Sequence, residues 1–168
     1  FGYHPVFNLF DSKLKIEEIL LMKGLEKSKA QAIEQKADAK KIPVKWVENR
    51  RILDDLAGGE NHQGVAASIK TDFPYVGLEQ LESAKVVVML DHLTDPRNFG
   101  AILRSCDQFE IDGVVIPDAR SCELNSTVLK TSSGAAFFVP VFRVPNLSQA
   151  LERLKSRGFW PYAAAGEE

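Results

Sequence analysis

Cysteine is scarce in this 168-residue sequence, which contains only Cys106 and Cys122 and no CxxC pair. Two cysteines cannot build a disulfide framework or a zinc site of paired thiolates, so we expect free thiols in a reducing compartment. The sequence also lacks any apolar run near the roughly 20 residues that cross a membrane, and its first residues do not have the pattern of a signal peptide. We therefore expect a cytoplasmic protein that is not inserted in a membrane.

Several common catalytic and nucleotide-binding motifs are missing as well. The sequence has no GxGxxG, no GxxxxGK[ST] and no GxSxG, which argues against an unrelated nucleotide-binding α/β enzyme and against a serine hydrolase. The three histidines, His4, His62 and His92, lie far apart and show no metal-binding spacing. We expect no metal site.

Excess charge of either sign is also absent, since the formal net charge is −2. The charges are distributed unevenly. Residues 1–74 carry a balance of +1 and ten of the thirteen lysines, whereas residues 75–168 carry a balance of −3. This net charge argues against a histone-like binder of nucleic acid, but a local basic face on the first part of the chain stays open.

Hydrophobic residues make up 45% of the chain and charged residues 26%, as in globular proteins. The pattern predicts an α/β fold in two units, residues 1–74 and 85–168, joined by a linker at 75–84 that contains Gly77. We expect strands at 16–22, 43–47, 62–69, 85–90, 113–117, 137–144 and 159–164. We expect helices at 28–39, 50–57, 98–109, 125–133 and 147–157. The second unit would hold a mostly parallel sheet covered on both faces, with residues 85–90 as a buried strand.

The segment Asp91–Cys106 follows a predicted strand and opens a predicted helix, where open α/β sheets bind ligands. We expect Asn98 to cap this helix, as Ser28 would cap the helix at 28–39. Gly100 and Ala101 would keep its first turn free of bulk, so that a substrate backbone could approach closely. Arg104 lies off the apolar stripe. From periodicity alone, an ordinary capped helix with one surface arginine explains the segment equally well.

The same segment resembles the SpoU/TrmH family of RNA ribose 2′-O-methyltransferases, whose first motif has an Asn-x-Gly-Ala-x-x-Arg-Ser core. Residues 98–105, NFGAILRS, carry the complete core. The resemblance continues through GVVIP at 113–117, Leu124-Asn125, SSGAAFFVPV at 132–141 and AAGE at 164–167. FGYHPV at 1–6 and HQGVAA at 62–67 resemble the N-terminal RNA-binding domain of the branch that includes the large-subunit rRNA guanosine methyltransferase.

This resemblance implies a small ribosomal-protein-like α/β domain, followed by a catalytic domain of the trefoil-knot class that works as a homodimer. The partner would be RNA, with rRNA favoured over tRNA, and the methyl donor S-adenosylmethionine. Arg104 would bind the RNA phosphate and help to activate the ribose 2′-hydroxyl, and Asn98 would line the active site. The implied RNA-binding residues are Gly2, His4, His62, Gln63, Gly64 and Arg97.

The second and third motifs of the family, which form the knot and most of the cofactor pocket, are absent from the sequence. Only Ala164 and Gly166 would belong to the rim of that pocket. We expect either a truncated polypeptide or a further tail that exists but is disordered, and weak binding of S-adenosylmethionine by these 168 residues alone. The alternative function is a non-catalytic RNA-binding remnant of such an enzyme.

Overall fold

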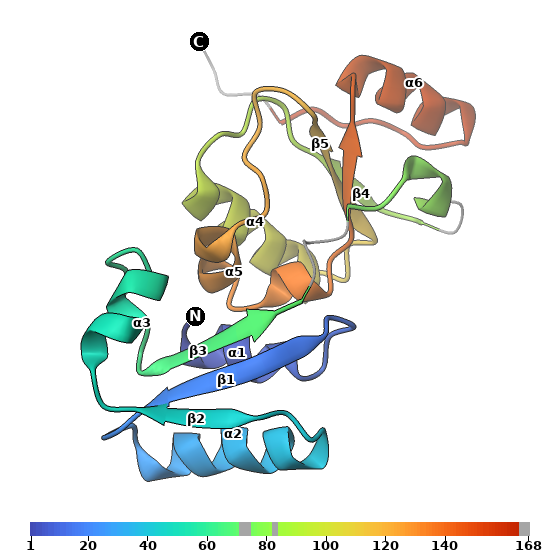
Figure 1. Cartoon of the computed structure of the whole chain (residues 1–168). Coiled ribbons are helices and arrows are strands. Elements are labelled where there is room, and N and C mark those ends of the chain that lie inside the picture. Colours follow the sequence, from blue (N-terminus) through green and yellow to red (C-terminus); the bar gives the residue numbers. More distant parts are fainter. Residues whose placement is uncertain (71–74, 82–83, 165–168) are drawn as a thin grey trace.

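The computed structural model describes residues 1–70, 75–81 and 84–164. They form two three-stranded sheets, each with its own helices (Figure 1). The expected α/β class is confirmed. No helix in the described ranges is long and apolar enough to cross a membrane.

The first sheet has the order β2-β1-β3, with β1 at Ile16–Met22, β2 at Val44–Val47 and β3 at Val65–Ile69. Strand β1 pairs in parallel with β2 and antiparallel with β3. Helices α1 (Tyr3–Leu9) and α2 (Lys27–Ala39) cover one face of the sheet, and α3 (Arg50–Leu56) packs against β1 and β3.

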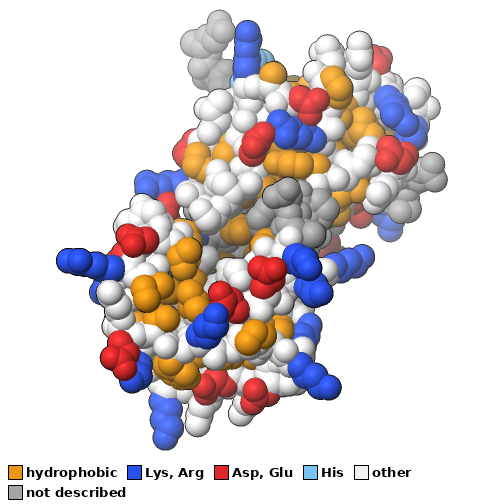
Figure 2. Space-filling view, in the orientation of Figure 1, with side chains coloured by type: hydrophobic (Ala, Val, Ile, Leu, Met, Phe, Trp, Pro, Cys, Tyr) orange, Lys and Arg blue, Asp and Glu red, His pale blue; other side chains and the backbone are white. Residues whose placement is uncertain are grey.

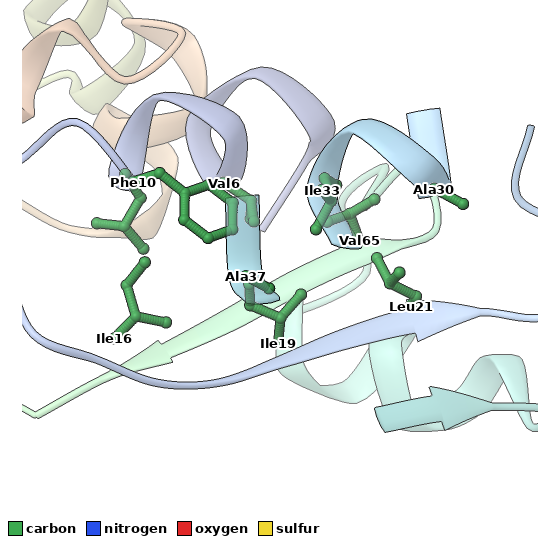
Figure 3. Close-up of a cluster of buried hydrophobic side chains, with 10 residues drawn as sticks. Val6, Phe10, Ile16, Ile19, Leu21, Ala30, Ile33, Ala37 and Val65 are labelled. Atoms are coloured by element: carbon green, nitrogen blue, oxygen red, sulfur yellow. The ribbon is translucent and has the colours of Figure 1, made fainter. Parts of the chain in front are cut away.

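The core of this unit lies between the sheet and helices α1 and α2 (Figure 3). Alternate residues of β1, Ile19 and Leu21, point into it and are fully buried. They meet Phe10, which follows α1, and Ile33 of α2. Burial alternates along this part of β1 because successive side chains point to opposite faces of a sheet.

The second sheet is entirely parallel, in the order β4-β5-β6. Its strands are β4 (Val87–Met89), β5 (Gly113–Pro117) and β6 (Val141–Val144). One face is covered by α4 (Pro96–Gln108), α5 (Ser126–Thr131) and the 3-10 turn η2 (Ala135–Phe137). The other face is covered by α6 (Leu147–Ser156) and the 3-10 turn η1 (Leu78–Leu81). The expected coverage of both faces is confirmed.

Four expectations for secondary structure are wrong. Residues 85–90 do not form a buried strand, because β4 is a short, half-buried strand at the edge of the described sheet. The expected strand at 62–69 begins only at Val65. The strand expected at 137–144 begins at Val141, since the preceding residues form η2. Residues 159–164 form no strand, and Trp160 and Tyr162 are largely exposed.

Helix α1 was not expected from the sequence. Pro5 falls in its first turn, where a missing N–H costs nothing because the turn's donors have no partner within the helix. Val6, Leu9 and the following Phe10 are buried. Apolar residues three and four positions apart are typical of one face of a helix, so this pattern indicates α1 in the sequence.

The two expected side-chain caps are also wrong. Asp95, not Asn98, caps α4: its carboxylate accepts a hydrogen bond of 3.0 Å from Arg97 N–H, and Pro96 begins the helix. Helix α2 begins after Glu26, and no side chain caps it. The hydroxyl of Ser28 instead donates to the Glu26 carboxylate.

The two units meet where α1 packs against α5 and η2 (Figure 1). Asn8 Nδ2 donates a 2.8 Å hydrogen bond to the Ser133 carbonyl. Glu60, which precedes the loop leading to β3, accepts from Thr127 Oγ1 at 3.0 Å and from Lys130 Nζ at 2.9 Å. These contacts fix α5 of the second unit against the first.

The ion pair across this junction gives stability that depends on pH. The hydrogen bond from Lys130 lowers the pKa of the Glu60 carboxyl. A carboxyl with a depressed pKa contributes stability above its unfolded pKa and loses it as pH falls through its folded pKa. We expect Glu60→Gln to lower stability by about 1 kcal/mol at pH 7, with the difference shrinking below about pH 4. Denaturant unfolding at several pH values measures this.

The control for that experiment is Glu48→Gln. Glu48 pairs with Lys23, but both side chains are mostly exposed and the pair does not join the two units. This substitution should change stability by less than about 0.5 kcal/mol. A Glu60→Gln effect that is equally small, or independent of pH, contradicts the assigned role of the junction.

Candidate functional site

Helix α4 presents the first group of predicted site residues. Arg97 and Arg104 are seven residues apart, so they lie on one stripe of the helix about two turns apart. Both are exposed, as are Asn98 and Ala101. Within the described ranges, the side chains of Arg104 and Asn98 make no hydrogen bond or ion pair. Arg104 is thus a guanidinium free to meet a ligand.

Gly100 does not leave room for a substrate backbone beside α4, contrary to our expectation from the sequence. It is buried, and it faces α5 and not solvent. A Cβ at this position would lie 2.7 Å from Thr131 Cβ and 2.8 Å from the Val128 carbonyl oxygen. The missing side chain lets two helices pack closely, so the space is filled by the protein itself and is closed to a substrate backbone.

The two thiols near this region are not poised for chemistry. Burial raises the pKa of Cys106, and burial together with the nearby carboxylates of Asp95 and Glu123 raises the pKa of Cys122. Both cysteines are free thiols, as expected, and both are buried. Because the thiolate is the nucleophile, neither is activated. Among the described residues, no group of three His, Cys, Asp or Glu side chains is arranged to hold a metal ion.

The second group of predicted residues meets in the first unit. The side-chain oxygen of Gln63 accepts a 3.0 Å hydrogen bond from Tyr3 N–H, and His4 comes next in the chain. Gly2 N–H bonds to the Val65 carbonyl. The two segments, 60 residues apart in the sequence, therefore lie side by side.

A hollow of about 530 Å³ lies where these segments meet. His4, His62, Gln63 and Gly64 line it, but Gly2 does not. Gly2 is buried at the start of α1, and Arg97 lies in the second unit on α4. The rest of the lining comes from the end of β1 and the loop after it, from the first turns of α1, α2 and α3, and from the residue before His62: Tyr3, Met22, Lys23, Gly24, Leu25, Glu26, Lys29, Arg50 and Asn61.

His62 supports the wall of the hollow from behind. It is only 2% exposed, and its Nδ1 accepts a 2.9 Å hydrogen bond from Gly64 N–H. Its Nε2 lies 3.2 Å from Oδ1 of Asp54, without the alignment of a hydrogen bond. Gln63 and Gly64 both have positive φ, 52° and 76°. The ring therefore fixes a tight turn whose neighbouring residues face outward.

The predicted cofactor residues lie at the end of the described chain. Ala164 is exposed and does not line the hollow, and Gly166 is outside the described residues. The assignment of Ala164 to a cofactor stays a prediction.

Comparison with known proteins accounts for both units. Residues 85–168 match the SpoU rRNA Methylase family, and residues 1–75 match the family described as RNA 2′-O ribose methyltransferase substrate binding. A putative TrmH family tRNA/rRNA methyltransferase of Staphylococcus haemolyticus is 39% identical over 99% of this chain and 68% of its own length. Its counterpart in Staphylococcus aureus strain MSSA476 is 40% identical over 95% of this chain and 66% of its own.

Solved structures share the fold. An rRNA methyltransferase from Sinorhizobium meliloti aligns with a TM-score of 0.70 and 19% identity, over 94% of this chain and 57% of that one. The SpoU methyltransferase AviRb from Streptomyces viridochromogenes, in complex with AdoMet, gives 0.66 and 19%, over 93% and 58%. The chain spans about two thirds of the length of the curated relatives and less of the solved structures. With both of its units matched in order and a relative 39% identical along nearly its whole length, the chain belongs to the SpoU/TrmH family of RNA methyltransferases.

Proposed function

We propose that the protein carrying this chain methylates the ribose 2′-hydroxyl of an RNA, with S-adenosylmethionine as methyl donor. In this proposal residues 1–74 bind the RNA, residues 75–84 link the units and residues 85–168 contribute to the transfer site. The family assignment supports the class of reaction. We further propose rRNA as the substrate, a cytoplasmic location and a homodimer.

The observation that carries the proposal is the free side chain of Arg104. A 2′-hydroxyl is a weak nucleophile, so transfer needs it to be held in line and its developing negative charge to be stabilised. A guanidinium stays charged in proteins and cannot act as a simple base. Arg104 therefore binds a phosphate next to the target ribose and stabilises the negative charge that develops on the 2′-oxygen as its proton passes to solvent water. Asn98, exposed in the first turn of α4, offers an amide to the same nucleotide.

S-adenosylmethionine, when bound, supplies the electrophilic methyl group that the ribose oxygen attacks. Among the described residues, only Ala164 is proposed to have a role toward it, and Ala164 is exposed. The roles proposed for this chain are therefore the binding and orientation of RNA and the stabilisation of charge by Arg104.

Transfer of tritiated methyl from S-adenosylmethionine tests the proposal. Unmodified rRNA and tRNA are offered separately to the protein carrying this chain, and the product is digested to nucleosides to locate the methyl group. We expect label on a ribose 2′-oxygen of rRNA. Label on a base contradicts the reaction class, and label on tRNA alone contradicts the substrate. RNA binding without any transfer supports the non-catalytic alternative.

A further inference from the structure

The hollow in the first unit has little free positive charge, although three cations line it. Lys29 Nζ lies 2.8 Å from a carboxylate oxygen of Glu26. Arg50 Nε lies 3.5 Å from a carboxylate oxygen of Asp54. Lys23 pairs with Glu48. The visible face of the molecule likewise mixes acidic and basic side chains (Figure 2). A phosphate entering the hollow would have to compete with carboxylates that are already bound.

The hollow offers instead the surfaces that a nucleobase uses. Tyr3 lines it, with its ring stacked on Phe7 at 5.6 Å between centroids and 24° between planes. The exposed His4 ring meets Tyr3 edge-on at 5.3 Å. Met22 and Leu25 add apolar lining. Aromatic rings held in place in this way stack on bases whatever their sequence.

Polar groups that could read the edge of a base lie beside these rings. The exposed Asn61 and Gln63 flank the buried His62, and both line the hollow. Gln63 N–H already donates to Asn61 Oδ1 at 3.1 Å, which holds the turn in one conformation. The site is therefore pre-formed, so binding a base there orders few groups of the protein.

We propose that this hollow binds one unpaired nucleotide of the RNA through its base, and does not hold the phosphates of a duplex. The inference rests on the proposed function, because it takes RNA as the ligand. It deepens that function by naming the substrate class: the target site lies next to a loop, bulge or end. In a paired stem the base faces are stacked and the edges are engaged, so the hollow would have nothing to receive.

Binding of two RNAs of equal length to this chain tests the proposal. One is a hairpin with 2-aminopurine in its loop, and the other is a fully paired duplex that carries the same label. We expect the hairpin to bind at least about tenfold more tightly, with quenching of the loop fluorophore on the Tyr3 ring. Because the cations of the hollow are paired, raising the salt concentration should weaken duplex binding more than hairpin binding.

Substitution of Tyr3 identifies the surface. Tyr3→Leu should weaken hairpin binding about tenfold and leave duplex binding unchanged, whereas Tyr3→Phe, which keeps the ring, should bind as the parent does. Tyr162→Leu removes an exposed tyrosine far along the chain and should change nothing. Circular dichroism with thermal melting checks that each variant is folded.

Three outcomes overturn the inference. The first is an equal affinity of the chain for hairpin and duplex. The second is an equal loss of affinity for the two RNAs in Tyr3→Leu. In these two cases the proposed function stands. Failure of the chain to bind either RNA contradicts this inference and the RNA-binding part of the proposed function together.

Discussion

Arg104→Ala is expected to lower the rate of methyl transfer to RNA by at least about 100-fold in the protein carrying this chain, while the fold stays intact. Loss of one preorganised donor to a developing oxyanion typically costs this much. The side chain is exposed and makes no hydrogen bond or ion pair in the described part of the chain, so its removal breaks no contact that holds the structure. Single-turnover transfer of tritiated methyl measures the rate.

Two further variants sharpen that experiment. Arg104→Lys keeps the charge but loses the forked geometry, so it should recover only part of the rate if the arginine grips a phosphate with two nitrogens. Arg153→Ala removes another exposed arginine, on α6, and should transfer at the parental rate. Near-parental turnover of Arg104→Ala would remove the residue from the mechanism.

Gly100→Ala is expected to destabilise the protein by about 2 kcal/mol, although alanine is the better helix former. In an open helix this exchange stabilises by up to about 1 kcal/mol. Here the new methyl group would press on Thr131 and on the backbone of Val128 and Ser132, the last with its nitrogen 3.0 Å away. Backbone cannot move aside as a flexible side chain can, so overpacking outweighs propensity.

Ala101→Gly serves as the comparison on the same helix. Ala101 is exposed, so this variant reports helix propensity alone and should lose about 1 kcal/mol. Urea unfolding of the two variants and the parent gives the free energies. A neutral or stabilising Gly100→Ala would mean that α4 and α5 are able to separate at this point.

The sequence pattern was sufficient to predict most strands and helices where one face is buried continuously. Strands β1 and β5 have the predicted boundaries because their apolar runs coincide with the core. Boundaries that depend on competing caps were missed: Asp95 and Asn98 are both good capping residues, and Pro96 after Asp95 decides between them. The unpredicted α1 shows the same limit, since Pro5 reads as a break unless it lies in a first turn.

Some residues of the candidate site could likewise be predicted from the sequence, and others could not. Arg104 lies on α4 outside the apolar stripe, so periodicity was enough to predict that its side chain is exposed. The hollow is built from four separate segments, residues 3–4, 22–29, 50 and 61–64, which only the tertiary fold brings together. Met22 N–H bonds to the Gly64 carbonyl, which brings the loop after β1 against the turn at His62. Local patterns do not reveal that Tyr3, Lys29 and Asn61 share one surface.

The central position of β1 in the first sheet constrains the order in which the protein forms during synthesis. Strand β1 is made early, but its antiparallel neighbour β3 lies more than 40 residues later, and Gly2 N–H bonds to Val65 at the start of β3. The first unit therefore cannot close until β3 has left the ribosome. Once it has, every strand of that sheet is available, and the unit can fold before β5 and β6 exist. Helix α1, held in this unit, is then in place as the surface on which α5 and η2 dock.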